Sequence, residues 1–429
     1  MESSYRLNPN KHSWMSNPNT KEIIRVISKG EKETRFVGGC VRDAILKREV
    51  HDIDIATTEH PKNIEFFLKE AGIKTVNIGI KHGTILAFHN YSKYEITTLR
   101  EDVKTDGRHA LVNFTNSWQI DAERRDFTFN ALSADLEGRV YDYCGGLNDI
   151  KEKTIRFVGK ATDRIHEDYL RILRYFRFIA TLNVEVGDES DFTACITLAD
   201  NIKKLSKERI RSEFFKIIDS DFSPNVIEKL HNHHILKQII PNVKDTESFR
   251  AIIQIENKVD DTNIVAFRSM RRLATLMDFD CPQIKEISKA LNLSKTEGHH
   301  LAQIASLTKK VTINFKQADL TRILYKYNKN VLIDSILVKC SKQYNTVRNK
   351  LVPREKGWLR IIKIIGTINE GSLVFPLSGK DVINLQIPAG PQISKFLKLT
   401  EDWWLSQGCN ATRDECLKKL QHFIKKQVL

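Results

Sequence analysis

Two aspartates separated by one residue, Asp52 and Asp54, are the first side chains whose type and spacing could do chemistry. The alternation of polar and apolar residues around them predicts a strand, on which both carboxylates point to one face and Ile53 points into the core. Carboxylates on one strand face, about 7 Å apart along the backbone, are suited to holding Mg²⁺. In a two-metal arrangement, one ion lowers the pKa of an attacking hydroxyl and the other neutralises a leaving phosphate.

A pair of glycines precedes these aspartates. Gly38 and Gly39 follow a predicted strand and let the backbone approach a phosphate closely, at the start of a helix that carries Arg42. An Asp-x-Asp pair alone is a weak signal, because most such pairs lie in exposed turns or helix caps. Preceded by Gly-Gly-x-Val-Arg-Asp and placed in a strand, the pair is a strong indication of a site for phosphate and metal.

A third carboxylate lies in another predicted strand. Glu95 is flanked by Tyr94 and Ile96, which point to the opposite face. Glu95 is therefore a candidate third acidic ligand, and a solvated residue on an edge strand is an equally good interpretation.

Charged residues cluster again between residues 123 and 130. Arg125, next to another arginine, suits a triphosphate, and Asp126 and Asn130 at positions i and i+4 could share a helical face toward a ribose. Taken alone, this stretch would be interpreted as the charged start of a helix.

The third constellation steps by three residues along a predicted helix. Asp168, Arg171, Arg174 and Arg177 form a polar ridge beside an apolar one. The plainer alternative is an ordinary surface pair between Glu167 and Arg171 at i and i+4.

The sharper interpretation of this ridge is stereochemical. Cytosine and adenine both offer an amino donor beside a ring acceptor, whereas guanine and uracil offer the reverse order. A carboxylate that only accepts, beside a guanidinium that only donates, matches C and A and leaves G and U with unpaired groups. Asp168 with Arg171 could therefore select CTP and ATP without a nucleic-acid template, because unpaired buried polar groups give strong discrimination.

The elements that must position these residues change character along the chain. The first 155 or so residues predict a mixed α/β head, with strands at TRFVGG, DIDIAT and RVYDYC, a helix near residues 61–71, and a hairpin made by GTILAFHN and YEITTL. From about residue 160 onward, apolar residues recur at helical spacing, and strand-like alternation nearly vanishes. The sequence predicts an α/β head followed by a long helical body.

Composition limits the class of protein. The 429 residues carry 68 Lys plus Arg and 54 Asp plus Glu, a formal charge of +14, and 41% hydrophobic residues, which excludes wholesale disorder. The first 200 residues have a net charge of −2 (29 basic, 31 acidic) and the rest +16 (39 basic, 23 acidic). This asymmetry favours a nucleic-acid partner over a merely basic surface.

Other sequence signals concern the compartment. No run approaches the roughly 20 apolar residues of a membrane span, and the first residues do not form a secretory signal. The seven cysteines are scattered, which fits a reducing compartment. We expect a cytoplasmic protein with no membrane association and no obligate protein partner.

The three constellations, in this order and spacing, resemble the class II tRNA nucleotidyltransferases, the CCA-adding enzymes of the nucleotidyltransferase and poly(A) polymerase family. The resemblance spans about residues 35–213. It implies an α+β fold, in which a small polymerase-β-like head with a mixed sheet precedes an all-helical neck, body and tail. The implied domains are an N-terminal extension (1–22), a catalytic head (23–157), a nucleotide-selecting neck (158–270), and a body (271–350) and tail (351–429) that bind tRNA.

The resemblance also implies roles for individual residues. Asp52 and Asp54 match the family's metal carboxylates. The nucleotide-binding positions implied by the match are Gly38, Gly39, Arg42, Arg125, Asp126, Asn130, Asp168, Arg171, Arg174 and Arg177. Residues 207–213 look like the motif that supports the neck helix.

Two further stretches bear on which family member this is. Residues 100–114 look like the flexible loop of enzymes that add the terminal A, and residues 76–84 look like the CCA-adding form. The resemblance thus implies Mg²⁺-dependent, template-independent addition and repair of the 3′-terminal CCA of tRNA from CTP and ATP. The alternatives are a poly(A) polymerase, a partial CC- or A-adding enzyme and, outside this class, a non-enzymatic RNA-binding protein.

Overall fold

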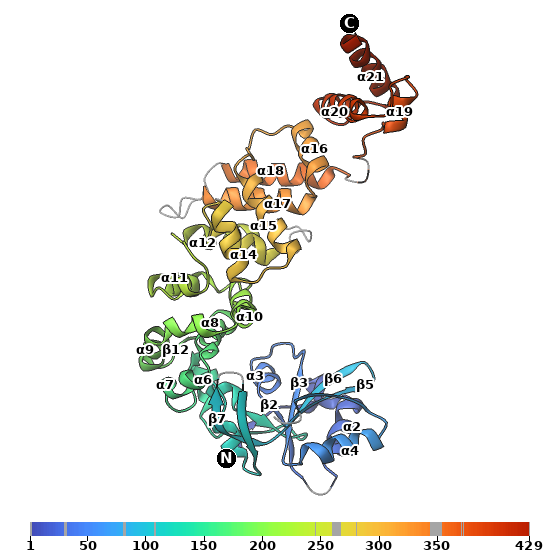
Figure 1. The fold of residues 1–429 in the computed structure, drawn as a ribbon. Helices are drawn as coiled ribbons and strands as arrows, with labels where there is room; N and C mark the ends of the chain where they lie inside the picture. Colours follow the sequence, from blue (N-terminus) through green and yellow to red (C-terminus); the bar gives the residue numbers. More distant parts are fainter. Residues whose placement is uncertain are drawn as a thin grey trace. The chain divides into compact units, whose positions relative to one another are not determined.

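The chain divides into two compact units, Met1–Val226 and Ile227–Leu429. The computed structural model in Figure 1 describes residues 2–29, 32–79, 83–106, 109–244, 246–259, 267–279, 281–343, 354–369, 371 and 373–428. None of the helices in these ranges is both long and apolar enough to cross a membrane.

A mixed sheet forms the centre of the first unit, with the strand order β1-β10-β9-β2-β3-β6-β5-β4. The pairing of β3 with β6 is parallel, and the other pairings in this sheet are antiparallel. The strands of this sheet are β1 (Glu2–Arg6), β2 (Thr34–Val37), β3 (Ile53–Thr57), β4 (Lys74–Gly79), β5 (Thr84–His89), β6 (Ser92–Thr98), β9 (Ser133–Ala134) and β10 (Arg139–Tyr141). Two small sheets pair β7 (Arg100–Asp106) with β8 (His109–Phe114), and β11 (Thr154–Ile155) with β12 (Glu185–Val186).

Helices pack around this sheet and continue beyond it (Figure 1). The helices of the first unit are α1 (Ser13–Ser16), α2 (Pro18–Ile27), α3 (Gly39–Ile45), α4 (Pro61–Glu70), α5 (Trp118–Glu123), α6 (Gly146–Glu152), α7 (Ala161–Glu167), α8 (Leu170–Leu182), α9 (Glu189–Thr197) and α10 (Lys207–Ile218), with 3₁₀ turns η1 (Pro9–Lys11), η3 (Thr128–Asn130) and η4 (Ala199–Lys204). The core of the head joins α2 and α4 to the apolar faces of β2, β3, β5 and β6. The predicted α+β architecture is confirmed.

The predicted hairpin is present. Strands β5 and β6 pair antiparallel from Thr84 with Thr97 to His89 with Ser92. Asn90 and Tyr91 make the turn in the left-handed region, with φ of 44° and 66°, which matches the twist of a two-residue hairpin turn.

The N-terminal segment is part of the head. Strand β1 pairs with β10, and Leu7 and Met15 are buried in the head core. Described residues of the predicted extension (1–22) therefore pack against the head. The predicted boundaries between head, neck, body and tail stay predictions.

The second unit is helical throughout its described residues. Helix α11 (Pro224–Asn232) spans the division between the units. The remaining helices are η5 (Leu236–Gln238), α12 (Glu247–Glu256), α13 (Arg268–Thr275), α14 (Cys281–Ala290), α15 (Lys295–Thr308), α16 (Gln317–Lys326), α17 (Lys329–Lys342), α18 (Arg354–Thr367), α19 (Gly379–Ile383), α20 (Pro391–Ser406) and α21 (Arg413–Val428).

An ionic network is buried inside this second unit. Arg271 on α13 donates to Glu256 on α12 at 2.7 Å and to Asp334 on α17 at 2.6 Å. His300 on α15 lies 2.7 Å from the other Asp334 oxygen. Since these side chains are at most 4% exposed, four helices are joined by charges that are almost completely removed from water.

Candidate active site

A cleft of about 480 Å³ in the first unit brings most of the predicted site residues together. Those that line it are Gly38, Gly39, Arg42, Asp54, Arg125, Asp126, Asn130, Asp168, Arg171, Arg174 and Arg177. These positions are spread over some 140 residues of sequence, so the fold makes one site of three separate constellations. We name this space the nucleotide cleft. Two predicted catalytic residues, Asp52 and Glu95, are not among its lining residues.

The carboxylate group is built on neighbouring strands. Strand β3 begins at Ile53, so the prediction that Asp52 lies within the strand is wrong by one residue, and Asp52 is exposed just before it. Asp54 is half-buried on β3 and pairs in parallel register with Glu95 on β6. Because β6 lies between β3 and β5, the interpretation of Glu95 as an edge-strand residue is also wrong.

The electrostatics at Asp54 suit a cation. Burial raises the pKa of Asp54 to about 6, repulsion from Glu95 and Asp52 adds to the rise, and Arg125 opposes it. A divalent ion with oxygen ligands would favour the ionised form of this carboxylate against its burial and against the nearby negative charges. Within the described part of the chain, no three metal-binding side chains already stand together as a cluster.

The glycine pair lies at the start of a helix, as predicted, and its role in binding phosphate stays a prediction. Gly38 has φ of 68°, which disfavours other residues, and a Cβ there would lie 3.2 Å from an Arg125 guanidinium nitrogen. Helix α3 begins at Gly39, and its Arg42 donates to the Asn130 side-chain oxygen at 2.7 Å.

The stretch after α5 differs from the predicted helical face. Residues Thr128–Asn130 form a short 3₁₀ turn, so Asp126 and Asn130 do not share an α-helix. They nonetheless meet, because the Asn130 amide donates to Asp126 at 3.1 Å. Arg125 donates to the Asn130 carbonyl at 3.3 Å and to Asp121 at 3.0 Å.

Arginines of α8 close another side of the cleft. Arg174 pairs with Asp126 at 2.5 Å, and Arg177 pairs with Glu213 of α10 at 3.1 Å. Burial alone would raise the pKa of Asp126, but the charge of Arg174 and the Asn130 hydrogen bond outweigh it and hold the pKa at about 2. Asp126 therefore stays ionised and is held by Arg174, so its carboxylate orients that guanidinium in the cleft.

In the predicted base-selecting pair, Asp168 lies between α7 and α8, and Arg171 lies in the first turn of α8. One Asp168 oxygen accepts from Arg209 of α10 at 2.7 Å, and the other accepts from the Leu170 backbone at 3.1 Å. Arg171 donates to Glu167 at 2.5 Å and to the backbone carbonyl of Arg164 at 2.9 Å. The Glu167 pair of the plainer interpretation is thus present, and it fixes an arginine that lines the cleft.

Two residues that hold this site were not predicted as site residues. Arg209 lies within residues 207–213, the stretch expected to support the neck helix, but its contact with Asp168, 41 residues away, was not predicted. Asp121, which pairs with both Arg124 and Arg125, could have been found from its i, i+3 and i, i+4 spacing to those arginines.

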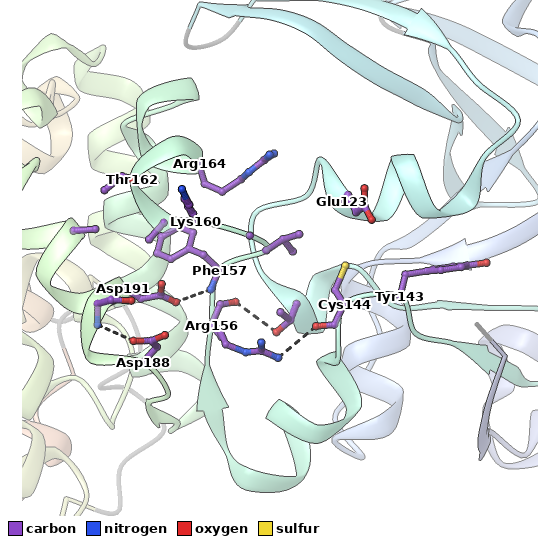
Figure 2. A pocket seen from close by; sticks show the side chains of 16 residues that line it. Glu123, Tyr143, Cys144, Arg156, Phe157, Lys160, Thr162, Arg164, Asp188 and Asp191 are labelled. Atoms are coloured by element: carbon purple, nitrogen blue, oxygen red, sulfur yellow. Dashed lines mark hydrogen bonds between the residues drawn. The ribbon is translucent and has the colours of Figure 1, made fainter.

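A larger cavity of about 780 Å³ lies on the other side of the segment that follows α5. Figure 2 shows Lys160 and Arg164 lining it opposite Glu123, with Asp191 accepting from the Phe157 backbone at 2.8 Å. None of the predicted site residues lines this cavity. Size alone therefore does not identify the site.

Comparison with known proteins identifies families and relatives that resemble this chain. Residues 34–156 match the family model of the poly A polymerase head domain, and residues 188–246 match that of the probable RNA- and SrmB-binding site of polymerase A. The mitochondrial CCA tRNA nucleotidyltransferase 1 of Mus musculus is 34% identical over 409 residues, covering 94% of this chain and 89% of the relative. The CCA-adding enzyme of Streptococcus gordonii is 34% identical over 316 residues, covering 73% and 76%.

Solved structures agree on the fold. The Bacillus stearothermophilus CCA-adding enzyme in complex with CTP has a TM-score of 0.74 and 23% identity, over 95% of this chain and 98% of that one. The Thermotoga maritima enzyme complexed with tRNA has a TM-score of 0.67 and 19% identity, over 98% and 97%. By its similarity to relatives along nearly its whole length, the chain belongs to the family of CCA-adding tRNA nucleotidyltransferases.

Proposed function

We propose that this protein builds and repairs the 3′-terminal CCA of tRNA, using CTP and ATP without a template and releasing pyrophosphate. The observation that carries the proposal is that Asp54 and the pair Asp168 and Arg171 line one cleft. A nucleotide in that cleft could place its base at the pair and its α-phosphate at the carboxylates. Family membership independently supports the same reaction.

The residues that line the nucleotide cleft have different roles in this proposal. Asp168 accepts from the amino group of C or A, and Arg171 donates to the ring nitrogen, which leaves G and U with mismatched groups. Arg42, Arg125 and Arg174 surround the phosphates and neutralise charge. Because their guanidiniums are already held by neighbouring side chains, positioning and charge stabilisation supply most of the acceleration.

We assign Mg²⁺ to Asp52 and Asp54, with Glu95 as a third acidic group beside them. The strand register that pairs Asp54 with Glu95 supports this assignment, because neighbouring carboxylates favour a bound divalent ion. When bound, the ion would supply activation of the tRNA 3′ hydroxyl and neutralisation of the leaving group. Removing divalent ions with EDTA should abolish incorporation, and Mg²⁺ should restore it.

The deciding experiment is to sequence the products made on a tRNA that lacks CCA, with CTP and ATP both present. We expect CCA and then termination. Long A tails would identify a poly(A) polymerase, and products ending after CC would identify a partial enzyme. Unchanged incorporation after Asp52→Ala plus Asp54→Ala would contradict the catalytic role of these carboxylates.

The cellular compartment of the protein is a separate prediction from its activity. The sequence predicts a cytoplasmic protein, whereas the mouse and human relatives are named as mitochondrial. Fractionation of cells that express the tagged chain, probed for the tag in cytosol and organelles, would decide between them.

A further inference from the structure

A second cleft adjoins the nucleotide cleft. Its volume is about 590 Å³, and Arg42, Arg177 and Phe178 line both spaces. Residues that line it and not the nucleotide cleft include Arg48, which follows α3, and Lys216 on α10. These shared residues form the wall between the two clefts, and we name the second space the exit cleft.

Cations crowd that shared wall. The guanidiniums of Arg42, Arg174 and Arg177 lie 5.2, 5.5 and 4.1 Å from the centre of the Phe178 ring. Burial, and then repulsion from Arg174, lower the pKa of Arg177 to about 10, although Glu213 opposes the shift. Each of these guanidiniums is held by a carboxylate, so their donors are gathered and oriented around one ring, an arrangement suited to binding a polyphosphate.

The exit cleft also contains positively charged side chains that are exposed to solvent. Arg48 is exposed and donates to the Thr181 carbonyl at 2.7 Å, which holds its guanidinium beside the C-terminal turn of α8. The Lys216 side chain is 55% exposed and 3.8 Å from Glu213, a distance that leaves its ammonium open to a further anion. Asp43 and Glu49 are the acidic residues of the lining, and Asp43 is already held by Arg42 at 2.8 Å.

A product of the proposed reaction could occupy this cleft, so this inference rests on the proposed function. The 3′ hydroxyl oxygen attacks the α-phosphorus and its proton passes to solvent water, while the bond from that phosphorus to the bridging oxygen breaks and its electron pair stays on the bridging oxygen. Pyrophosphate then leaves with the bridging oxygen, on the side opposite the attack. With the base at Asp168 and Arg171, the β- and γ-phosphates lie toward Gly39 and Arg42. We propose that the exit cleft binds the departing pyrophosphate, with Arg48 and Lys216 as its outer cations.

Product inhibition tests this proposal on the full chain. The inhibition constant of inorganic pyrophosphate should rise roughly five- to tenfold in Arg48→Ala plus Lys216→Ala, because each exposed ion pair contributes a modest attraction. The KM for CTP should change less than about twofold, since both side chains lie outside the nucleotide cleft. Arg48→Lys should keep much of the pyrophosphate affinity, because it keeps the charge.

The control is Lys62→Ala plus Lys69→Ala, which removes the same charge from the exposed face of α4. An unchanged inhibition constant in the exit-cleft variant would overturn the proposal. So would a rise in the KM for tRNA at constant pyrophosphate inhibition, which would mean that the cleft holds an RNA backbone phosphate. Failure of the proposed function is separate, because the wild-type chain would then make no CCA.

Discussion

At the scale of single residues, the groups proposed to select the base are held by other groups of the protein. Asp168 has one partner on each oxygen, and Arg171 is fixed by Glu167 and a backbone carbonyl. A carboxylate oxygen can accept a second hydrogen bond, so an arriving base adds contacts to a preset geometry. Discrimination between bases then depends on the match of donors and acceptors.

Changing Asp168 should therefore alter base choice more than catalysis as such. Asp168→Asn keeps the shape but replaces one acceptor by a donor, and hydrogen bonds to charged groups are worth about 1.5–3 kcal/mol. We expect kcat/KM for CTP to fall tenfold or more and the preference for CTP over UTP to shrink, as measured by single-nucleotide incorporation. Asp163→Asn, on the exposed part of α7, is the control. Unchanged preference would contradict the base-selecting role.

Asp126 makes a prediction about pH. Its pKa is about 2 in the folded protein, below the usual 3.8, so the unfolded chain takes up the proton first. The contribution to stability, about 2 kcal/mol, is complete above pH 4 and is lost as pH falls toward 2. In urea titrations, the stability difference between wild type and Asp126→Asn should narrow by roughly 1 kcal/mol between pH 7 and pH 3. A difference independent of pH would contradict the depressed pKa.

At the scale of elements, helix α10 orients side chains at the end of α7 and on α8. Arg209 and Glu213 on one face of α10 hold Asp168 and Arg177, so the support comes from 36 to 41 residues away in sequence. Local patterns predicted β2, β3, β5, β6 and β10, the hairpin and α8, because hydrophobic periodicity is a property of each segment alone. The parallel pairing of β3 with β6, and the reach of Arg209 to Asp168, depend on tertiary structure and could not be predicted that way.

Arg209 should act as a positioning residue. In Arg209→Ala we expect a loss of CTP-over-UTP preference with the KM for tRNA unchanged, and Arg209→Lys should restore part of the preference. The effect should be small in an Asp168→Ala background, since the two side chains act as one unit. Arg211→Ala, whose guanidinium lies over Phe215 on the same helix, is the matched control. Equal losses of CTP-over-UTP preference in the wild-type and Asp168→Ala backgrounds would show that Arg209 has a merely structural role.

At the scale of the whole molecule, the chemistry and the buried ionic network belong to different units. Asp334→Asn would remove the carboxylate that His300 contacts and one of the two carboxylates that hold Arg271, which keeps Glu256. Breaking a buried pair costs about 3–5 kcal/mol, so the free energy of unfolding should fall by about 3 kcal/mol or more. Denaturant titration measures this loss, with the exposed Asp402→Asn as the control. A change below about 1 kcal/mol would contradict the estimate.

The CTP affinity of this Asp334 variant should remain at the wild-type value under native conditions, since the residues that line the nucleotide cleft belong to the first unit. Sequence patterns could not predict this network, because its members come from four helices and each looks like an ordinary surface charge in isolation. The asymmetric charge of the chain did predict which half favours a polyanion, and that expectation still awaits a binding measurement.

Confinement of the nucleotide cleft to Met1–Val226 has an evolutionary consequence. Substitutions can accumulate in the helices of Ile227–Leu429 while the residues that line the nucleotide cleft stay unchanged. Properties that depend on the second unit can thus evolve separately from the choice of nucleotide.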